Sequence, residues 1–442
     1  MTDTQTASTF KGKLLATLGG LMALQIVLAH ISRTQGGHLT SGVLILLCVL
    51  AIVFVDRRGE RQLPTVPPAI WIPLLAWAGF ATLSIAWSMR PSATLNNLAS
   101  DLWMPVACFY GAFLLGNAGR TRAPVWGALI GLALILLTSL ATIAMVGPET
   151  LARGLPPELR NAAVVKWFPG PGKASTMIIT MLPLLVWAIR ARVISRPVGS
   201  VALVVALLCG AATQNRMFWV CLLTLGACAL LFRVHRRGVR RAVTPRALLG
   251  AFGFVALCAV MFVVLLNLRA PATVQATGSA VDVTGAVSAV QQDPRQVIWS
   301  YWIDMGKKSP WIGTGFGKRA ASVANDPSHP LYQRTRDNLG WHPHNVFLSM
   351  WVQLGWAGLT LFVLFVGGML YHSIVIAQPG SRDRIAGMAF FMLIAALMAK
   401  NLTDDFYDRE LANTFFSYTG LLIGAAAWPP GRRKDSAADA AG

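Results

Sequence analysis

The stretch NLGWHPHNVFLSMWVQLGWAGL, residues 338–359, places two histidines and a proline directly before a long apolar run. The run continues to about residue 371, which is long enough to cross a bilayer, since a transmembrane helix needs about 20 apolar residues. Pro343 favours an extended conformation at His342, and Asn345 is a good N-cap residue. The stretch therefore predicts a transmembrane helix over 345–371 with His342 and His344 at its start.

Similar apolar runs recur along the whole chain. Its 442 residues are 55% hydrophobic and only 13% charged, whereas soluble domains carry about 25% charged residues. The runs have helical lengths and lack the roughly 10-residue alternation of an outer-membrane barrel. The sequence predicts an all-α polytopic membrane protein with about twelve transmembrane helices. They are expected over 14–32, 40–56, 68–87, 97–117, 124–146, 174–190, 199–215, 217–233, 248–268, 345–371, 384–400 and 411–428.

The spans over 199–215 and 217–233 are almost continuous, because only the polar TQNR at 213–216 separates them. A single helix over both would need about 35 residues, well beyond the roughly 20 that cross a bilayer. The sequence therefore predicts a helical hairpin with Arg216 at its tip.

The joints between the predicted spans are alternately rich and poor in lysine and arginine. The joint RVHRRGVRRAVTPR, residues 233–246, carries six arginines, whereas each short joint expected on the opposite side of the membrane carries at most two cations. By the positive-inside rule, both termini are expected in the cytoplasm. The net charge of +20 is explained by topology and by anionic lipid headgroups, so we expect membrane lipids and no nucleic acid as partners.

This orientation divides the chain into four parts. Residues 1–268 hold the first nine spans with an outside joint at 147–173, 269–344 form a long outside loop, 345–428 hold the last three spans, and 429–442 form a cytoplasmic tail. Loops of such length are usually functional or disordered. After Pro294, an apolar stripe of Val297, Ile298, Trp302 and Met305 predicts an interfacial helix lying on the membrane.

The positive-inside rule does not explain the few lysines and arginines that are expected outside, so each of them calls for a separate explanation. Arg216 at the membrane face either snorkels to lipid phosphate or faces a polar cavity. Arg295 could stack on Trp299 or meet an anionic headgroup, whereas Trp299 alone could be a membrane anchor. Arg160 and Lys173 in the first long joint are further candidates. Cations that converge on one outside cavity would suit a pyrophosphate, because guanidinium groups bind phosphate oxygens in pairs.

The segment PWIGTGFGKRA, residues 310–320, has alternating glycines at 313, 315 and 317. It lacks the preceding strand and the spacing of a nucleotide-binding loop. Glycines in this pattern predict a tight turn that lets the backbone approach the bilayer or a ligand.

The two histidines suit proton transfer better than metal binding. A helix N-terminus disfavours a protonated imidazole, so His344 could remove a proton from a hydroxyl; the alternative is that it only caps hydrogen bonds. Asp404, Asp405 and Asp408 could orient such a base, pair with arginines or be solvated, and we select Asp405, with Asn345, for the supporting role. Two histidines do not complete a zinc shell, and we expect neither a metal nor a cofactor.

Four motifs together resemble the signature of the O-antigen ligase and polymerase superfamily. They are R-x-x-x-W at 295–299, PWIGTGFG at 310–317, HPHNVFLSMWVQLGWAGL at 342–359 and TQNR at 213–216. The twelve spans and the long loop between spans nine and ten fit the same family, so the resemblance covers the whole architecture.

The resemblance implies a GT-C-like, metal-independent glycosyltransferase of the bacterial inner membrane that uses undecaprenyl-pyrophosphate-linked glycans. In a ligase, the O-antigen glycan passes in the periplasm to a sugar hydroxyl of lipid A–core, during lipopolysaccharide assembly. By motif match, Arg216 and Arg295 would hold the pyrophosphate. His344 would deprotonate the acceptor hydroxyl, with His342 as its support and with inversion at the anomeric carbon.

Three alternatives remain. An O-antigen polymerase often has a second arginine-rich periplasmic loop, but 147–173 is short. A protein O-oligosaccharyltransferase often has an extended periplasmic C-terminal region, but this chain ends in RRKDSAADAAG. A secondary transporter of an anionic solute needs charged or broken helices near the middle of the membrane, whereas the ionisable residues here cluster at the ends of the spans. The glycan, the acceptor sugar and the oligomeric state do not follow from the sequence.

Overall fold

A computed structural model describes most of the chain, and the described residues form helices without any β-strand. They are 3–31, 35–57, 64–146, 171–213, 215–237, 253, 295–322, 328–329, 332, 342–378, 381, 383–405 and 407–427. Within these ranges, 7 helices are long and apolar enough to cross a membrane, and Thr40–Asp56, Arg122–Thr138 and Arg196–Ala212 are shorter apolar helices. The protein is therefore an all-α polytopic membrane protein, as the sequence predicted.

Every predicted span except the ninth coincides with a helix of the structure. These helices are α1 (Asp3–Ile31), α2 (Gln35–Arg57), α3 (Pro68–Leu83), α5 (Met104–Asn117), α6 (Arg122–Val146), α9 (Pro171–Arg190), α10 (Arg196–Ala212), α11 (Arg216–Arg237), α19 (Val346–Ile376), α20 (Arg384–Asn401) and α21 (Arg409–Ala427). The ninth span, 248–268, lies outside the described residues apart from position 253. The predicted break between the two spans is confirmed, because α10 ends at Ala212 and α11 begins at Arg216. The two helices do not pack along each other as a hairpin would: α10 packs mainly on α9, and α11 packs mainly on α20.

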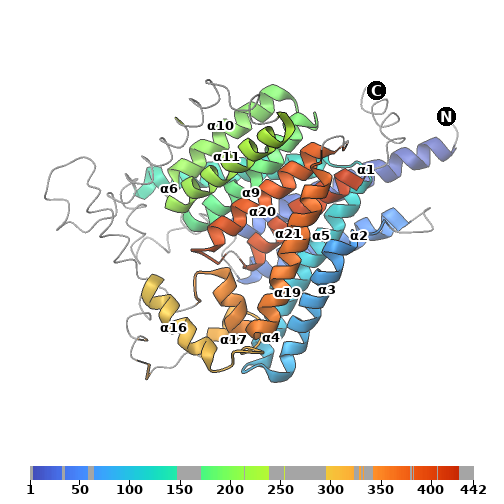
Figure 1. Ribbon diagram of the computed structural model, residues 1–442. Coiled ribbons are helices and arrows are strands. Elements are labelled where there is room, and N and C mark those ends of the chain that lie inside the picture. Colours follow the sequence, from blue (N-terminus) through green and yellow to red (C-terminus); the bar gives the residue numbers. More distant parts are fainter. Residues whose placement is uncertain are drawn as a thin grey trace.

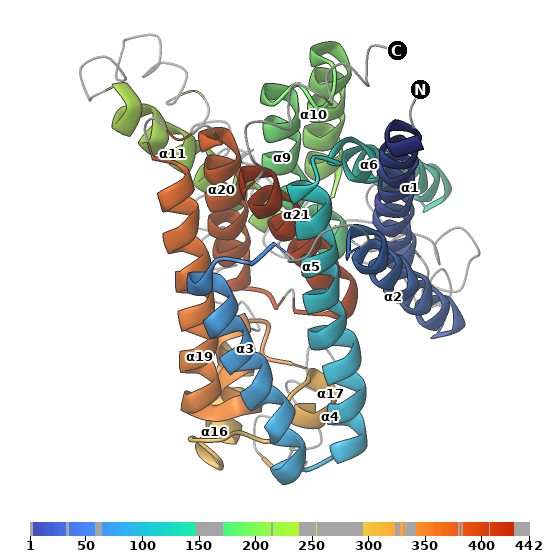
Figure 2. The same cartoon turned by 90° about the vertical axis from the view of Figure 1, so that its right-hand side faces the viewer.

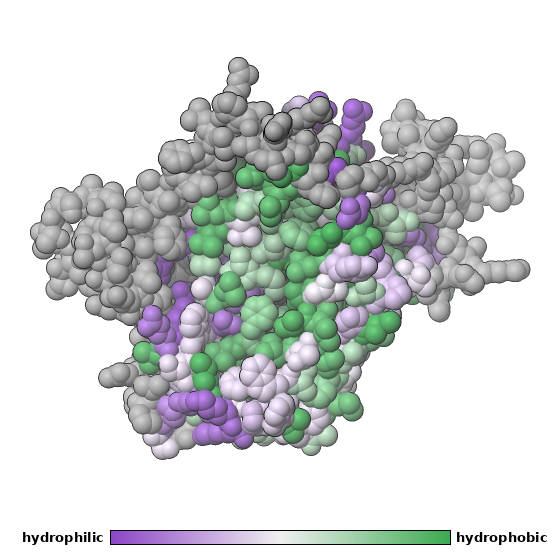
Figure 3. Space-filling model, in the orientation of Figure 1, coloured by the Kyte–Doolittle hydropathy of each residue, from purple (hydrophilic) through white to green (hydrophobic). Residues whose placement is uncertain are grey.

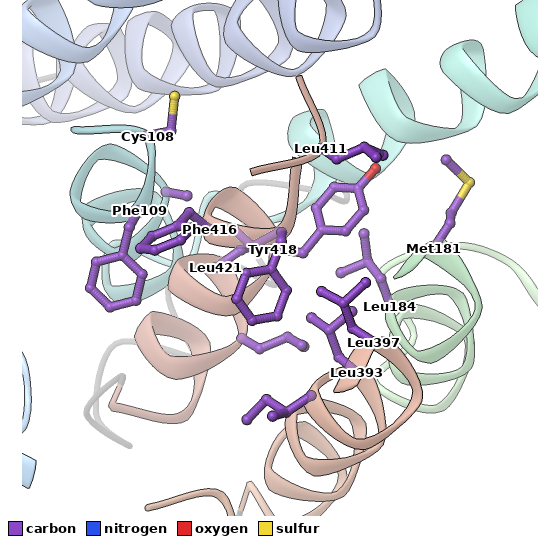
Figure 4. Close-up of a cluster of buried hydrophobic side chains, with 14 of the residues drawn as sticks. Cys108, Phe109, Met181, Leu184, Leu393, Leu397, Leu411, Phe416, Tyr418 and Leu421 are labelled. Carbon is purple, nitrogen blue, oxygen red and sulfur yellow. The ribbon is translucent and has the colours of Figure 1, made fainter. Parts of the chain in front are cut away.

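Helix α21 forms the centre of the bundle (Figure 1). Its residues from Leu411 to Ala425 are all buried, although they include serine, threonine and asparagine. Gly420 and Gly424 let it approach α5 so closely that a Cβ atom at either position would overlap the α5 backbone. In Figure 4, side chains of α21 pack among residues of α5, α9 and α20. Small residues at such contacts are typical of helices that associate inside membranes.

The outer surface fits a lipid environment. In Figure 3, hydrophobic side chains cover the middle of the molecule and hydrophilic ones gather towards its ends. Leu47, Leu50 and Phe54 of α2 and Leu364 of α19 are among the large exposed apolar residues. Since a bilayer would cover this band, its exposure needs no protein partner.

Helix α19 is broken at Gly355, which corrects the prediction of one continuous helix over 345–371. Gly355 has φ 65° and ψ −170°, a conformation that is open to glycine and costly for other residues. The break leaves backbone groups on both sides without partners within the helix, and the glycine loop, residues 309–317, supplies them. Four hydrogen bonds join the two segments: Trp356 N–H to the Pro310 carbonyl (2.8 Å), Ala357 N–H to the Trp311 carbonyl (3.2 Å), Thr314 N–H to the Val352 carbonyl (3.1 Å) and Gly315 N–H to the Gln353 carbonyl (2.9 Å).

The predicted tight turn at the glycine loop is confirmed, because Gly313, Gly315 and Gly317 all have positive φ. The surface that the loop approaches is α19. The loop also contacts the turn after α3, where the Phe316 N–H donates to the Ser84 hydroxyl (3.0 Å). It therefore ties three segments together that are far apart in the sequence.

Helix α16 (Arg295–Lys307) precedes the glycine loop and packs on the first part of α19. Its residues Ile298, Trp302 and Met305 are buried in one cluster with Val352 of α19. The predicted helix and most of its apolar stripe are confirmed, but the stripe contacts protein; its position relative to the membrane stays a prediction.

The cationic joints predicted on the inside lie away from the two histidines. The α5–α6 and α9–α10 joints lie at the end of the bundle opposite α16 and α17 (Lys318–Ala321) (Figures 1 and 2). Arg192 lies in the second joint, and Arg122 and Arg196 begin the helices that follow the two joints. This separation agrees with the charge count. Which end faces the cytoplasm stays a prediction.

We predict that Gly355→Ala destabilises the protein by about 3 kcal/mol or more, because it combines a disfavoured φ with an overlap. The added Cβ would meet the Trp311 carbonyl. Gly367→Ala on the same helix is the matched control, since nothing lies within 4 Å of the position of its Cβ. It should stay within about 1 kcal/mol of wild type. Thermal unfolding in detergent measures both, and equal stabilities of the two variants would contradict the role of the break.

Candidate active site

The structure places His342 and His344 next to each other before α19, as predicted. The His344 N–H donates to Nδ1 of His342 (3.2 Å), and the two ring centroids are 3.9 Å apart. His344 has φ 51°, which is uncommon for a residue other than glycine. Backbone strain of this kind is often found at functional sites.

Asn345 is the N-cap of α19, which confirms the sequence prediction. Its Oδ1 accepts hydrogen bonds from the N–H groups of Phe347 (2.9 Å) and Leu348 (3.0 Å). Its Nδ2 donates to the Leu402 carbonyl at 3.0 Å. Asn345 thus holds the start of α19, and His344 with it, against the end of α20.

Asp404, in the joint between α20 and α21, is the carboxylate beside His344. Its Oδ1 lies 3.7 Å from Nδ1 of His344, somewhat longer than a hydrogen bond, as is common in active sites without substrate. Its Oδ2 accepts a hydrogen bond from Lys400 Nζ (3.0 Å), and the Lys400 side chain is only 1% exposed. Burial alone would raise the pKa of Asp404, but the Lys400 charge, the adjacent His344 ring and the hydrogen bonds from Lys400 and the Asp405 N–H lower it. Asp404 is therefore an ionised partner for His344.

Asp405, which the sequence analysis selected to orient the base, contacts a different residue. Its side chain is fully buried, and its Oδ2 lies 3.4 Å from Nζ of Lys318. Lys318 also donates to the Asp405 backbone carbonyl at 3.0 Å. In the described part of the chain, the carboxylate nearest His344 is therefore Asp404. The two neighbouring carboxylates thus have different partners: Asp404 contacts His344 and Lys400, and Asp405 contacts Lys318.

Lys318 was not singled out from the sequence, although it directly follows the glycine loop. The Gly317 N–H donates to Oε1 of Gln353 on α19 (2.7 Å), which fixes the loop just before Lys318. The only signal in the sequence was a lysine after alternating glycines, and that pattern gave no indication of what the lysine contacts.

The lysine and His342 line one cavity of about 820 Å³. Helices α1, α2, α5, α9, α17 and α21, with α4 (Pro91–Asn97) and the π-helical turn η2 (Leu98–Trp103), surround it. Its cationic residues are Lys173, Lys318, Arg319 and Arg409, its acidic residues are Asp101, Asp408 and Glu410, and its apolar residues include Ala29, Val43, Ile45, Leu46 and Met104. A cavity with an apolar side and a cationic side suits an amphiphilic anion.

A second hollow, of about 710 Å³, lies at the other end of the bundle, between the α5–α6 and α9–α10 joints. Arg122, Arg192 and Arg196 line it without any histidine or carboxylate. The cavity beside the histidines is therefore the better candidate for chemistry.

The other predicted cations lie in different surroundings. Lys173 lines the cavity, but its Nζ lies 3.0 Å from Asp408 Oδ2 and 3.1 Å from Glu410 Oε2, so two carboxylates already balance its charge. Of the described cavity residues, neither Arg216 nor Arg295 is part of the lining. Arg160 lies outside the described residues.

Arg216 nevertheless lies at the same end of the bundle as the site. Cys221, one turn further along α11, donates to the Ala396 carbonyl of α20 (3.3 Å), one turn before Lys400. Arg295 begins α16, with Trp299 half-buried one turn further on. The roles of Arg216, Arg295 and Trp299 in binding stay predictions.

His342 is suited to remain a neutral imidazole. Burial lowers its pKa well below the usual value, the charge of Lys318 and the neighbouring His344 lower it further, and Asp404 opposes them. Its Nδ1 accordingly accepts the His344 N–H. Among the described residues, no group of three or more His, Cys, Asp or Glu side chains is placed to hold a metal ion.

Comparison with known proteins agrees with the sequence motifs. Residues 201–363 match the protein family described as O-Antigen ligase. The matched range includes Arg216, α16, the glycine loop, both histidines and the break in α19. No curated protein matches the chain.

We predict that Asp404→Asn costs about 3 kcal/mol of stability, because it leaves the buried Lys400 without its carboxylate. Lys400→Met in the same chain should recover most of the loss. The exposed pair Lys307–Asp304 provides the control, and Asp304→Asn should leave the stability close to that of wild type.

Melting temperatures in detergent measure these differences. The effect of Asp404→Asn should shrink as the pH falls, because the folded pKa of Asp404 is lowered. Such a carboxylate contributes its full stability above its unfolded pKa and loses it as the pH falls towards its folded pKa. If Asp404→Asn cost no more than Asp304→Asn at neutral pH, Asp404 would not be the partner that Lys400 requires.

Proposed function

Because the chain belongs to the O-antigen ligase superfamily, we propose that it transfers an O-antigen glycan from undecaprenyl pyrophosphate to a sugar hydroxyl of lipid A–core. Enzymes of this family are glycosyltransferase-like and act in polysaccharide assembly. We place the reaction at the periplasmic face of the bacterial inner membrane, on a GT-C-like scaffold. The observation that carries the proposal is the histidine pair beside a cavity with one cationic and one apolar side.

In the proposed reaction, His344 is the general base. It takes the proton of the acceptor hydroxyl, and the acceptor oxygen forms a bond to the anomeric carbon of the donor glycan. The bond between that carbon and the phosphate oxygen breaks, and its electron pair leaves with undecaprenyl pyrophosphate. Attack opposite to the leaving group inverts the anomeric configuration. The lipid pyrophosphate is already a good leaving group, so the proposal needs neither nucleotide nor metal.

The residues around His344 support this role. Asp404 lies beside Nδ1 of His344 and would leave Nε2 to accept the proton. An ionised Asp404 also stabilises the imidazolium that forms, as a carboxylate does for other catalytic histidines. Lys400 acts indirectly: it positions Asp404 by a hydrogen bond of 3.0 Å, and Asp404 in turn lies beside His344.

The cations near the histidines would bind the pyrophosphate. Lys318 and Arg319 on α17 and Arg409 at the start of α21 line the cavity with His342. Arg216 and Arg295 join them in the proposal through the motif match. Charged hydrogen bonds to the leaving group lower the barrier because its negative charge grows as the bond breaks. The polyprenyl tail would lie against the apolar side formed by α1 and α2.

We predict that His344→Ala lowers glycan transfer by about 100-fold or more, as expected for loss of a general base. His372→Ala, which removes a histidine from the far part of the same helix, is the matched control and should transfer at the wild-type rate. Transfer is measured with purified protein, a lipid-linked glycan and lipid A–core. Transfer by His344→Ala at the control rate would eliminate His344 as the base.

We further predict that Lys318→Gln, Arg216→Ala and Arg295→Ala raise the KM for the lipid-linked donor by about 10-fold or more, since each removes a charged hydrogen bond. Arg216→Lys and Arg295→Lys should recover only part of the loss, because lysine lacks the paired geometry of the guanidinium group. An unchanged donor KM in both arginine-to-alanine variants would favour the snorkelling interpretation. Peptide and free glycan tested beside lipid A–core would reveal a protein O-oligosaccharyltransferase or a polymerase.

A further inference from the structure

The cavity has a third side that the proposed reaction does not use. We call it the polar wall; its residues come from α4, η2 and α21. They are Asn96, Asn97, Ser100, Asp101 and Asn413. None of them is a cation that could bind a pyrophosphate, and none belongs to the apolar side. The wall therefore needs an explanation of its own.

Asn413 is the clearest sign that the polar wall binds something. It is 2% exposed, yet its Oδ1 has no hydrogen-bond partner in the described part of the chain. A buried amide oxygen without a partner is costly, and such groups call for a specific reason. Since Asn413 lines the cavity, a ligand in the cavity can supply the missing donor.

Asp101 is held in an unusual backbone conformation. It lies within the π-helical turn η2, and single π-turns inside helices are frequent at functional sites. Its Oδ1 accepts a hydrogen bond from the Ser100 hydroxyl (2.6 Å). This hydrogen bond fixes one carboxylate oxygen. Ser100 and Asp101 both line the cavity, where the carboxylate can accept a hydrogen bond from a ligand.

The polar wall adjoins the cationic side of the cavity. Asn97 packs so tightly on the glycine loop that a Cβ at Gly317 would overlap its amide group. Gly317 directly precedes Lys318, and Lys318 and His342 line the same cavity. A group bound at the wall therefore lies next to a pyrophosphate held by Lys318 and near the histidine pair.

We propose that the polar wall is a carbohydrate subsite, which binds the sugar attached directly to the lipid pyrophosphate. Amide groups both donate and accept hydrogen bonds, and carboxylates accept them, so the wall matches the hydroxyl and acylamino groups of a sugar ring. A site built to bind such groups rejects a sugar that lacks them. The inference rests on the proposed function and extends it: these residues select the donor.

The test compares donor binding with binding of the carrier alone. Asn413→Leu and Asp101→Asn should each raise the KM for the lipid-linked glycan by about threefold to tenfold, the range for loss of a neutral hydrogen bond. Inhibition by undecaprenyl pyrophosphate, which carries no sugar, should stay within about twofold of wild type. Lys318→Gln is the matched contrast, because it should weaken inhibition by undecaprenyl pyrophosphate as well.

A second readout separates binding from support of the fold. Asn413→Leu replaces a side chain whose buried Oδ1 has no hydrogen-bond partner among the described residues by an apolar one, so its melting temperature should equal or exceed that of wild type. A lower melting temperature together with an unchanged donor KM would make Asn413 a structural residue and overturn the proposal.

Selectivity gives the third readout. Two donors that differ only in one acylamino group of the first sugar should be discriminated by wild type and much less by the variants. If the variants discriminated the two donors as wild type does, or if only the KM for the acceptor changed, the carbohydrate subsite would be wrong. The proposed transfer reaction would not be affected by either result. If wild-type protein transferred no glycan from any lipid-linked donor, the proposed function would itself be wrong.

Discussion

The hydrogen bonds between the glycine loop and the broken turn of α19 are the constraint on which the site depends. Gly355 opens the helix, and the loop around Gly313 and Gly315 satisfies the backbone groups that the break exposes. A buried backbone group without a partner is costly, so the two segments stabilise each other. Their contact fixes α16 before the loop and Lys318 after it. It thereby brings residues that are distant in sequence to the start of α19.

The joint between α20 and α21 provides the complementary half. Asp404 contacts His344 and Lys400, Asp405 contacts Lys318, and Asp408 contacts Lys173. One short segment thus holds His344 and two lysines of the cavity in a fixed relation. A buried lysine is costly unless its charge is paired. The ion pair of Lys400 with Asp404 therefore links the end of α20 to the candidate base. A lipid pyrophosphate would meet this arrangement from the apolar side formed by α1 and α2.

The sequence predicted what local patterns determine. Apolar runs predicted the helices, because burial in a bilayer requires length and hydropathy alone, and Asn345 was predicted as a cap because capping is decided within a few residues. The break at Gly355 was missed, since glycine is common in transmembrane helices and the partner of the broken turn lies about 40 residues away in the sequence. Whether Asp404 or Asp405 contacts His344 depends on the side of one backbone turn to which each carboxylate points, and the sequence pattern does not determine this. Lys318 was missed for the same reason: its contacts are made by the fold.

The central claim is that this arrangement transfers a glycan from a lipid pyrophosphate by base and cation catalysis alone. The most direct measurement uses purified protein in lipid nanodiscs with EDTA and no nucleotide, supplied with undecaprenyl-pyrophosphate-linked glycan and lipid A–core. Mass spectrometry would follow both products. We expect glycosylated lipid A–core and free undecaprenyl pyrophosphate in equal amounts. Transfer that requires a divalent metal or a nucleotide, or carrier release without glycosylated acceptor, would contradict it.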